Sequence, residues 1–183
     1  MKIVDVTVEQ YAWSRPRPIA NGKYTYTRLS LNVIKVHTDE GITGVGWTGG
    51  TASGRPYGVV PPLVEHFKQV LIGQDPFDYQ RLWTRMWEPK IVGRRGIATH
   101  VISAIDIALW DLMGKALNKP VHKLLGGFRD RIPAYIAGGY YEEGKGLREL
   151  AKEMEENLAL GAKAVKMKVG GVSMAEDVER VRV

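Results

Sequence analysis

Apolar and polar positions alternate along the first part of the chain in a pattern that predicts an antiparallel sheet. Residues 2–12 alternate with a period of two, and residues 24–37 and 42–47 are two further strands rich in β-branched and aromatic side chains. Residues 38–41, Thr-Asp-Glu-Gly, are typical of a hairpin turn between the second and third strands. Two prolines and an Asn-Gly pair predict a loop over residues 14–23.

The spacing of apolar residues then changes to that of helices. Pro61-Pro62 predicts the first turn of one helix, and Asp75-Pro76 predicts the N-cap and first residue of the next. Residues 97–117 are the most apolar stretch and predict a buried helix that packs on the sheet. We expect Trp83 to lie in the core, and the glycines of residues 44–50 to serve turns, because they lack the spacing of a phosphate loop.

The last third of the chain alternates strands with helices. We expect a strand, a helix, a second strand and a second helix, over residues 131–137, 146–160 and 164–169 and from Ser173 onward. Short connections between these elements predict parallel strands joined by crossovers.

These patterns predict the fold class and its division. We expect residues 1–127 to form an α+β domain, an antiparallel meander with helices, and residues 128–183 to form two β/α units, which the family resemblance given below implies are the first two of a TIM-type barrel. A whole barrel takes about 250 residues. We therefore expect the barrel to be incomplete in this chain.

Composition limits the possible cellular compartments and binding partners of the protein. The chain has 183 residues and no cysteine, which excludes disulfides and thiolate metal sites and suits a cytoplasmic location. We expect no membrane partner, because no apolar run approaches about 20 residues and the N-terminus has no signal-peptide core. The formal net charge is +6, and the basic residues are scattered through loops. That distribution favours a solvated surface or a small anionic substrate over nucleic acid.

The strongest candidate for chemistry is the segment Lys166-Met167-Lys168. A strand has a period of two, so both lysines project from one face, which in a barrel strand can be the active-site mouth. Two neighbouring ammonium groups repel each other and burial disfavours charge, so one lysine could be neutral and act as a general base. The alternative is an edge strand with two solvated lysines.

Four segments in order along the chain resemble the mandelate racemase and muconate lactonizing enzyme family of the enolase superfamily. Residues 101–115, VISAIDIALWDLMGK, resemble its signature helix, and Pro120 followed by Leu-Leu-Gly-Gly at 124–127 continues that pattern. Residues 71–76, LIGQDP, match another of its segments, and residues 162–170, AKAVKMKVG, resemble its barrel strand with the K-x-K motif.

This resemblance implies an α+β capping domain over a modified β/α barrel. It implies a base that removes the proton α to a carboxylate, with Mg²⁺ stabilising the ene-diolate. By the family pattern Lys168 is the base, and Lys166 lies beside it and faces the substrate carboxylate. Capping loops at residues 14–24 and 48–57 would close over the substrate, and our candidates for contacts there are Arg15, Lys23, Tyr24, Arg55 and Tyr57.

The resemblance also implies what lies outside these 183 residues. The family's metal ligands and its second acid or base come from later barrel strands, so the Mg²⁺ ligands are expected beyond residue 183. We expect this chain alone neither to bind catalytic Mg²⁺ nor to turn over substrate. The favoured reaction is dehydration of a sugar acid. The alternatives are a racemase or cycloisomerase of the same family, or a non-catalytic N-terminal fragment, and the family suggests a homo-oligomer.

Overall fold

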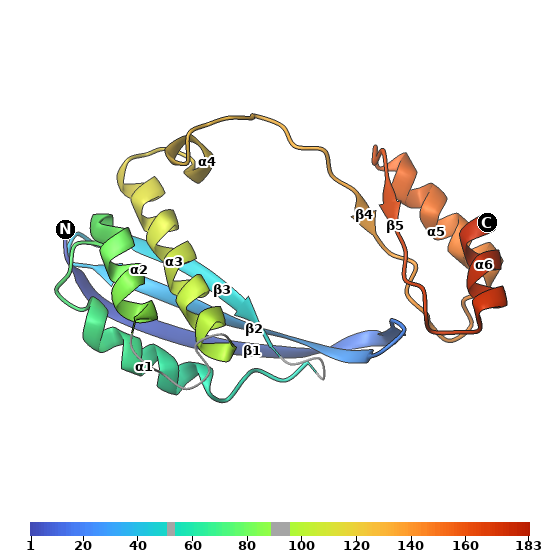
Figure 1. Cartoon of the computed structure of the whole chain (residues 1–183), viewed down its shortest axis with the longest axis horizontal. Coiled ribbons are helices and arrows are strands. Elements are labelled where there is room, and N and C mark those ends of the chain that lie inside the picture. The colour runs from blue at the N-terminus through green and yellow to red at the C-terminus, as the bar shows by residue number, and fades with distance from the viewer. Residues whose placement is uncertain (51–53, 89–95) are drawn as a thin grey trace. The chain divides into compact units, whose positions relative to one another are not determined.

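The computed structural model describes residues 1–50, 54–88 and 96–183 (Figure 1). The elements are β1 (Ile3–Ala20), β2 (Thr25–Thr38), β3 (Thr43–Gly49), α1 (Val60–Leu71), the 3-10 helix η1 (Pro76–Asp78), α2 (Tyr79–Trp87), α3 (Ile97–Ala116), α4 (Val121–Leu124), β4 (Ile136–Ala137), α5 (Leu147–Ala159), β5 (Val165–Lys166) and α6 (Met174–Arg182). They form two compact units. Unit 1 comprises Met1–Ala12, Ser30–Thr51 and Arg55–Phe128, and unit 2 comprises Trp13–Leu29, Ala52–Gly54 and Arg129–Val183.

The antiparallel meander is confirmed, with strand order β1-β2-β3 and β2 paired to β3 from Leu31↔Gly49 to His37↔Thr43. The third strand therefore runs past residue 47. Gly44 and Gly46 are strand residues, which corrects the expectation of turn glycines. A Cβ at Gly46 would lie 1.9 Å from the carbonyl oxygen of Ala104 in α3. These glycines allow the backbone of α3 to lie directly on β3.

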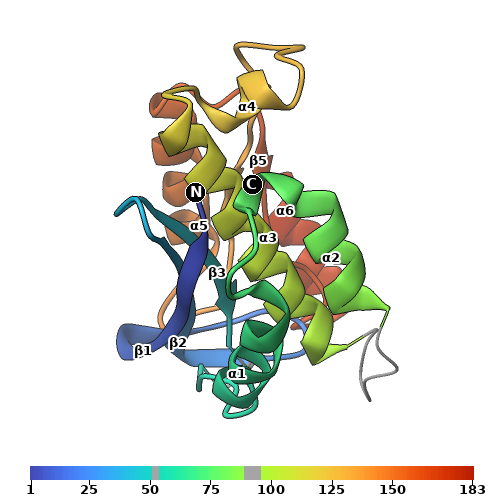
Figure 2. The same cartoon turned by 90° about the vertical axis from the view of Figure 1, so that its left-hand side faces the viewer.

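The core of unit 1 lies between the sheet and its helices. Helix α3 packs on β3, and α1 and α2 pack against α3 (Figure 1, Figure 2). The expected helix starts are confirmed by the prolines in the first turn of α1 and by Asp75, whose side chain accepts a hydrogen bond from the Phe77 amide at the start of η1. Trp83 is not a core residue: it is 37% exposed, and its ring stacks on that of Trp87 at 5.2 Å.

Helix α3 is the buried helix that the apolar pattern predicts. Its buried side chains include Val101, Ile105, Leu109 and Leu112. By length and composition alone this 20-residue helix could cross a membrane, contrary to our expectation that no segment would qualify. It is nevertheless 56% buried over its most apolar window, as the core helix of a globular domain is.

Strand β1 overturns the loop predicted for residues 14–23. The strand continues to Ala20, and only residues 21–24 form a turn. β1 is at one edge of the meander, and the Ala20 amide points away from β2, donating to the Tyr141 carbonyl at 2.8 Å. Pro16 and Pro18 share the orientation of Ala20 through the period of two. Their missing N–H groups therefore fall on the outer side, where no bond to β2 is lost.

Unit 2 contains two β/α units, which confirms the predicted alternation. β4 and β5 pair in parallel with Ile136 opposite Val165, and each strand is followed by a helix. Both strands are shorter than predicted. Residues 131–135 are exposed and include Pro133, which cannot donate to a ladder. Ser173 caps α6 by accepting from the Glu176 amide, in a capping box with the Glu176 carboxylate.

Candidate active site

Lys166 and Lys168 lie at the carboxyl end of β5, where the parallel pairing with the β4 segment continues. The Gly138 amide donates to the Lys166 carbonyl at 2.8 Å, and the Lys168 amide donates to the Gly139 carbonyl at 3.3 Å. Each ammonium lies over a tyrosine ring from the β4 segment. Lys166 Nζ is 5.9 Å from the ring centroid of Tyr135, and Lys168 Nζ is 4.9 Å from that of Tyr140. Both distances are within cation–π range.

The backbone of Gly139 forms hydrogen bonds with three segments of unit 2: α5, the segment that follows β5, and α6. Its amide donates to the Glu153 carboxylate of α5 at 3.2 Å, and its carbonyl accepts from both the Lys168 amide and Nη2 of Arg180, the latter at 2.9 Å. Its φ is +61°, and a Cβ there would lie 2.4 Å from the Met167 Cβ. Glycine is therefore required beside the K-x-K segment.

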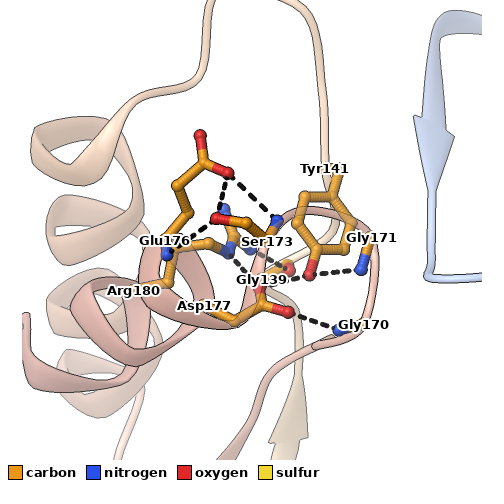
Figure 3. A network of polar contacts seen from close by, with 8 residues as sticks. All are labelled: Gly139, Tyr141, Gly170, Gly171, Ser173, Glu176, Asp177 and Arg180. Carbon is orange, nitrogen blue, oxygen red and sulfur yellow. Dashed lines mark hydrogen bonds and ion pairs between the residues drawn. The ribbon is translucent and has the colours of Figure 1, made fainter.

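A polar network fixes the loops that follow β4 and β5 (Figure 3). The Tyr141 hydroxyl donates to Asp177 Oδ1 at 2.5 Å and accepts from the Gly171 amide at 2.9 Å. The Gly170 amide donates to Asp177 Oδ2 at 2.5 Å. Arg180 is only 9% exposed and lies 4.2 Å from the Tyr141 ring. The segment that carries Lys168 is thus bonded to α6 through the Gly170 amide, which follows Lys168 by two residues.

The same network shifts the pKa values of two ionisable groups, Tyr141 and Asp177. Burial, followed by donation to Asp177, raises the pKa of the Tyr141 hydroxyl. The hydrogen bond from Tyr141, followed by that from the Gly170 amide, lowers the pKa of the Asp177 carboxyl. Both shifts favour a neutral phenol that donates to an ionised carboxylate.

The β1–β2 hairpin ends in a turn that Asn21 organises. Its Oδ1 accepts from the amides of Lys23 at 2.8 Å and Tyr24 at 2.7 Å, and its Nδ2 donates to the Tyr26 hydroxyl at 2.7 Å. A Cβ at Gly22 would lie 2.5 Å from the Gly170 carbonyl oxygen. The turn therefore lies directly against the loop that follows β5.

Two tyrosines connect this hairpin to the predicted base. The rings of Tyr26 and Tyr140 meet edge to face, with centroids 6.3 Å apart and an interplanar angle of 88°. Tyr140 in turn lies under the ammonium of Lys168. Side-chain contacts therefore run without interruption from Asn21 to Lys168.

The structure places the predicted substrate-contacting residues in both units. Arg15 is half-buried on β1, while Lys23 and Tyr24 are exposed in the hairpin turn, with Lys23 Nζ 5.3 Å from the Tyr24 ring. Arg55 and Tyr57 belong to unit 1. The Tyr57 ring packs against the core of that unit and lies 6.4 Å from the His100 ring. Of the five, only Arg15, Lys23 and Tyr24 share a unit with the two lysines.

Sequence reasoning missed the residues that support the lysines, chiefly Tyr26 and Tyr140. One signal was available for Tyr140, because two tyrosines directly follow Gly138-Gly139 at the end of a predicted barrel strand. No comparable signal marked Tyr26, which sits in a strand where aromatic residues are common.

One pocket of unit 2 is lined in part by residues of the polar network and does not include either lysine. It measures about 910 Å³, and Arg17, Ala20, Tyr141, Glu176 and Arg180 are among its lining residues. It is formed by the outer side of β1 and the start of α5 and α6. The pocket therefore does not mark the predicted reaction centre.

The described residues form no cluster of three or more side chains that could together hold Mg²⁺. Within residues 1–50, 54–88 and 96–183, no three carboxylate or histidine side chains come close enough to hold a metal ion. Mg²⁺ is bound through oxygen ligands, with carboxylates foremost.

Known proteins resemble this chain in sequence and in fold. Residues 3–126 match the model for the mandelate racemase / muconate lactonizing enzyme family, N-terminal domain. The chain is 40% identical over 155 residues to an arabinonate dehydratase of Saccharolobus solfataricus, covering 84% of the chain and 41% of the relative. It is 37% identical over 159 residues to a 3,6-anhydro-alpha-L-galactonate cycloisomerase of Streptomyces coelicolor, covering 84% and 42%.

A solved structure extends the likeness into unit 2. A racemase from Streptomyces coelicolor A3(2), crystallised with bound magnesium, matches with a TM-score of 0.86 and 31% identity over 98% of this chain and 50% of that one. The chain thus spans half or less of the length of each of these proteins.

Proposed function

The chain belongs to the mandelate racemase and muconate lactonizing enzyme family, and from this premise we propose that it supplies the base and the substrate-covering hairpin of an enzyme that dehydrates a sugar acid. The reaction begins with removal of the proton α to the carboxylate. Lys168 is the base, and Lys166 faces the substrate carboxylate. The observation that carries the proposal is the position of Lys168 at the carboxyl end of a parallel strand, beside the hairpin turn.

The proposed step uses the lone pair of a neutral Lys168 Nζ. That nitrogen takes the α-proton, and the electrons of the C–H bond move into the carboxylate to give an ene-diolate. In a dehydration the β-hydroxyl then leaves with a proton from an acid that this chain does not assign. A positive Lys166 beside the carboxylate would favour the added negative charge. Mg²⁺, when bound by residues outside this chain, would stabilise the same charge.

A second candidate is cycloisomerisation or racemisation, which begins with the same proton removal. The likeness to a cycloisomerase at 37% identity supports it. The arabinonate dehydratase, at 40%, favours dehydration. A third possibility is a fragment that has no activity by itself, because the chain spans less than half of either relative.

The base assignment is tested by deuterium exchange at the α-carbon of sugar acids such as arabinonate, in a protein that combines this chain with the remaining barrel. Lys168→Ala should lower exchange by at least about 10²-fold, since a positioned general base typically contributes that much. Lys163→Ala, an exposed lysine of the same segment, is the control. Normal exchange by Lys168→Ala with every active acid would disprove the role of Lys168.

We also propose a cytoplasmic homo-oligomer. The absence of cysteine and the family resemblance support this. Light scattering on the protein as it elutes from a size-exclusion column would report the mass of the oligomer directly.

A further inference from the structure

Tyr140 occupies a distinctive place between the predicted base and the hairpin. One face of its ring lies under the Lys168 ammonium, with 4.9 Å between Nζ and the ring centroid. The Tyr26 ring meets it edge to face at 6.3 Å. The hydroxyl of Tyr26 is held in turn by Asn21, the residue that forms the turn carrying Lys23 and Tyr24.

Each of these contacts constrains the position or the orientation of the next side chain. The negative face of an aromatic ring attracts a cation, so Tyr140 fixes where the Lys168 ammonium lies. An edge-to-face pair depends on the angle between its rings, so Tyr26 constrains the orientation of Tyr140. A displacement of the hairpin turn would move Tyr26 and thereby change the orientation of the Tyr140 ring, which faces Lys168.

The backbone around Tyr140 is fixed from both sides. Gly139 is held by the Glu153 carboxylate and by buried Arg180. Tyr141 is held by Asp177 and also pairs with Ala20 of the hairpin through two backbone hydrogen bonds of 2.8 and 2.9 Å. The backbone on both sides of Tyr140 is therefore fixed, and the Tyr26 ring constrains the orientation of the Tyr140 ring.

We propose that Tyr140 is a positioning residue, which holds the ammonium of Lys168 and couples it, through Tyr26 and Asn21, to the hairpin that covers the substrate. The coupling to catalysis rests on the proposed function. The contact itself does not. Substrate that orders the hairpin would thus also fix the position of Lys168 Nζ, the atom that takes the proton.

The contact is tested by NMR on the 183-residue chain labelled at its lysine ε-carbons, with Lys168 assigned from its loss in Lys168→Arg. The ring current of Tyr140 should place the Lys168 ε-proton signal upfield of exposed lysines. Tyr140→Leu should remove that shift, and Tyr140→Phe, which retains the ring, should keep it. The Lys166 signal, set by Tyr135, should stay in place in both variants and reports that unit 2 is folded.

An unmoved Lys168 signal in folded Tyr140→Leu would overturn the proposal. Should Tyr140→Leu lose the Lys166 signature through unfolding, Tyr26→Leu decides instead. A weakened Lys168 shift in that variant supports the coupling, and an unchanged shift refutes it.

The catalytic consequence is tested through the rate of α-proton exchange and its dependence on substrate concentration in the protein with the complete barrel. Loss of the ring in Tyr140→Leu should lower the maximal exchange rate at least about tenfold with little change in KM, because misplacement of a reacting group by about 1 Å can cost about 10²-fold. Tyr140→Phe, which retains the ring, should keep both constants. A maximal rate unchanged by Tyr140→Leu would refute the coupling to catalysis. If the unmodified protein exchanges no acid, the proposed function fails, while the NMR result still decides whether Tyr140 holds Lys168.

Discussion

At the residue scale, the contact between β3 and α3 depends on two missing side chains. A Cβ at Gly44 would lie 2.0 Å from the Ala108 carbonyl oxygen, and one at Gly46 would lie 1.9 Å from that of Ala104. Both obstacles are helix backbone, which cannot rotate away as a side chain can. Gly49, on the same strand, has no heavy atom within 4 Å of its Cβ position.

This contrast predicts the outcome of two matched substitutions. Gly46→Ala should destabilise unit 1 at the upper end of the about 1–3 kcal/mol typical of overpacking, because strand and helix must separate. Gly49→Ala should leave the stability within about 0.5 kcal/mol of the unsubstituted chain. Urea unfolding followed by tryptophan fluorescence would measure both. Equal stabilities for the two variants would show that the close approach of α3 has no energetic importance.

The residues of the candidate site were predictable to different degrees. Lys166 and Lys168 stand out because their two-residue spacing on a strand is visible in the sequence. Tyr26 and Tyr140 were not predicted, since their importance comes from a contact between segments more than a hundred residues apart. The Asn-Gly pair at Asn21 did predict a turn, but not the hydrogen bond from Asn21 to Tyr26. The glycines of β3 were misinterpreted for the same reason, because only the arrival of α3 explains them.

At the scale of elements, helices were predicted well and strand ends poorly. Helix limits follow local signals such as Asp75 and Ser173, each of which caps its own helix. Strand length depends on which segment pairs with the strand, and the sequence alone does not show that pairing. β1 runs through two prolines because its outer edge needs no ladder there, whereas β4 keeps only two residues paired with β5.

Helix α6 carries a prediction about pH. Because the hydrogen bond from Tyr141 lowers the pKa of Asp177 in the folded chain below the ordinary value of about 3.9, its carboxylate stabilises the fold above that value. The contribution is lost as the pH falls through the lowered pKa. Asp177→Asn should therefore destabilise unit 2 at pH 7, and its difference from the unsubstituted chain should shrink at pH 2–3.

Urea titrations at the two pH values, followed through the amide NMR signals of Gly170 and Gly171, would measure this difference. Glu155→Gln, an exposed position on α5, serves as the control for removing one negative charge. A loss of stability that is the same at both pH values would mean that Asp177 acts by shape and not by charge.

At the scale of the whole molecule, the chain combines a family N-terminal domain with two β/α units. The family model covers residues 3–126, and the magnesium-bound racemase extends the likeness to 98% of the chain. The pattern of apolar residues was sufficient to predict both parts. It could not predict that the hairpin residues 13–29 group with residues 129–183 in one compact unit, because that grouping depends on contacts such as Ala20 with Tyr141.

The size of unit 2 leads to the last prediction, which concerns activity. Two parallel strands cannot close a barrel, and β5 retains an unpaired edge among the described residues. Val169, Val172 and Met174, which follow β5 along the chain, are exposed apolar side chains. We expect the purified 183-residue chain to show no Mg²⁺-dependent exchange of the α-proton of any sugar acid, and exchange to appear only when the remaining strands are supplied, by a longer polypeptide or by a second one. The measurement is deuterium incorporation with the chain alone, with and without Mg²⁺, and with the completed barrel. Mg²⁺-dependent exchange by the pure chain, lost in Lys168→Ala, would show that these residues form a working site without the rest of the barrel.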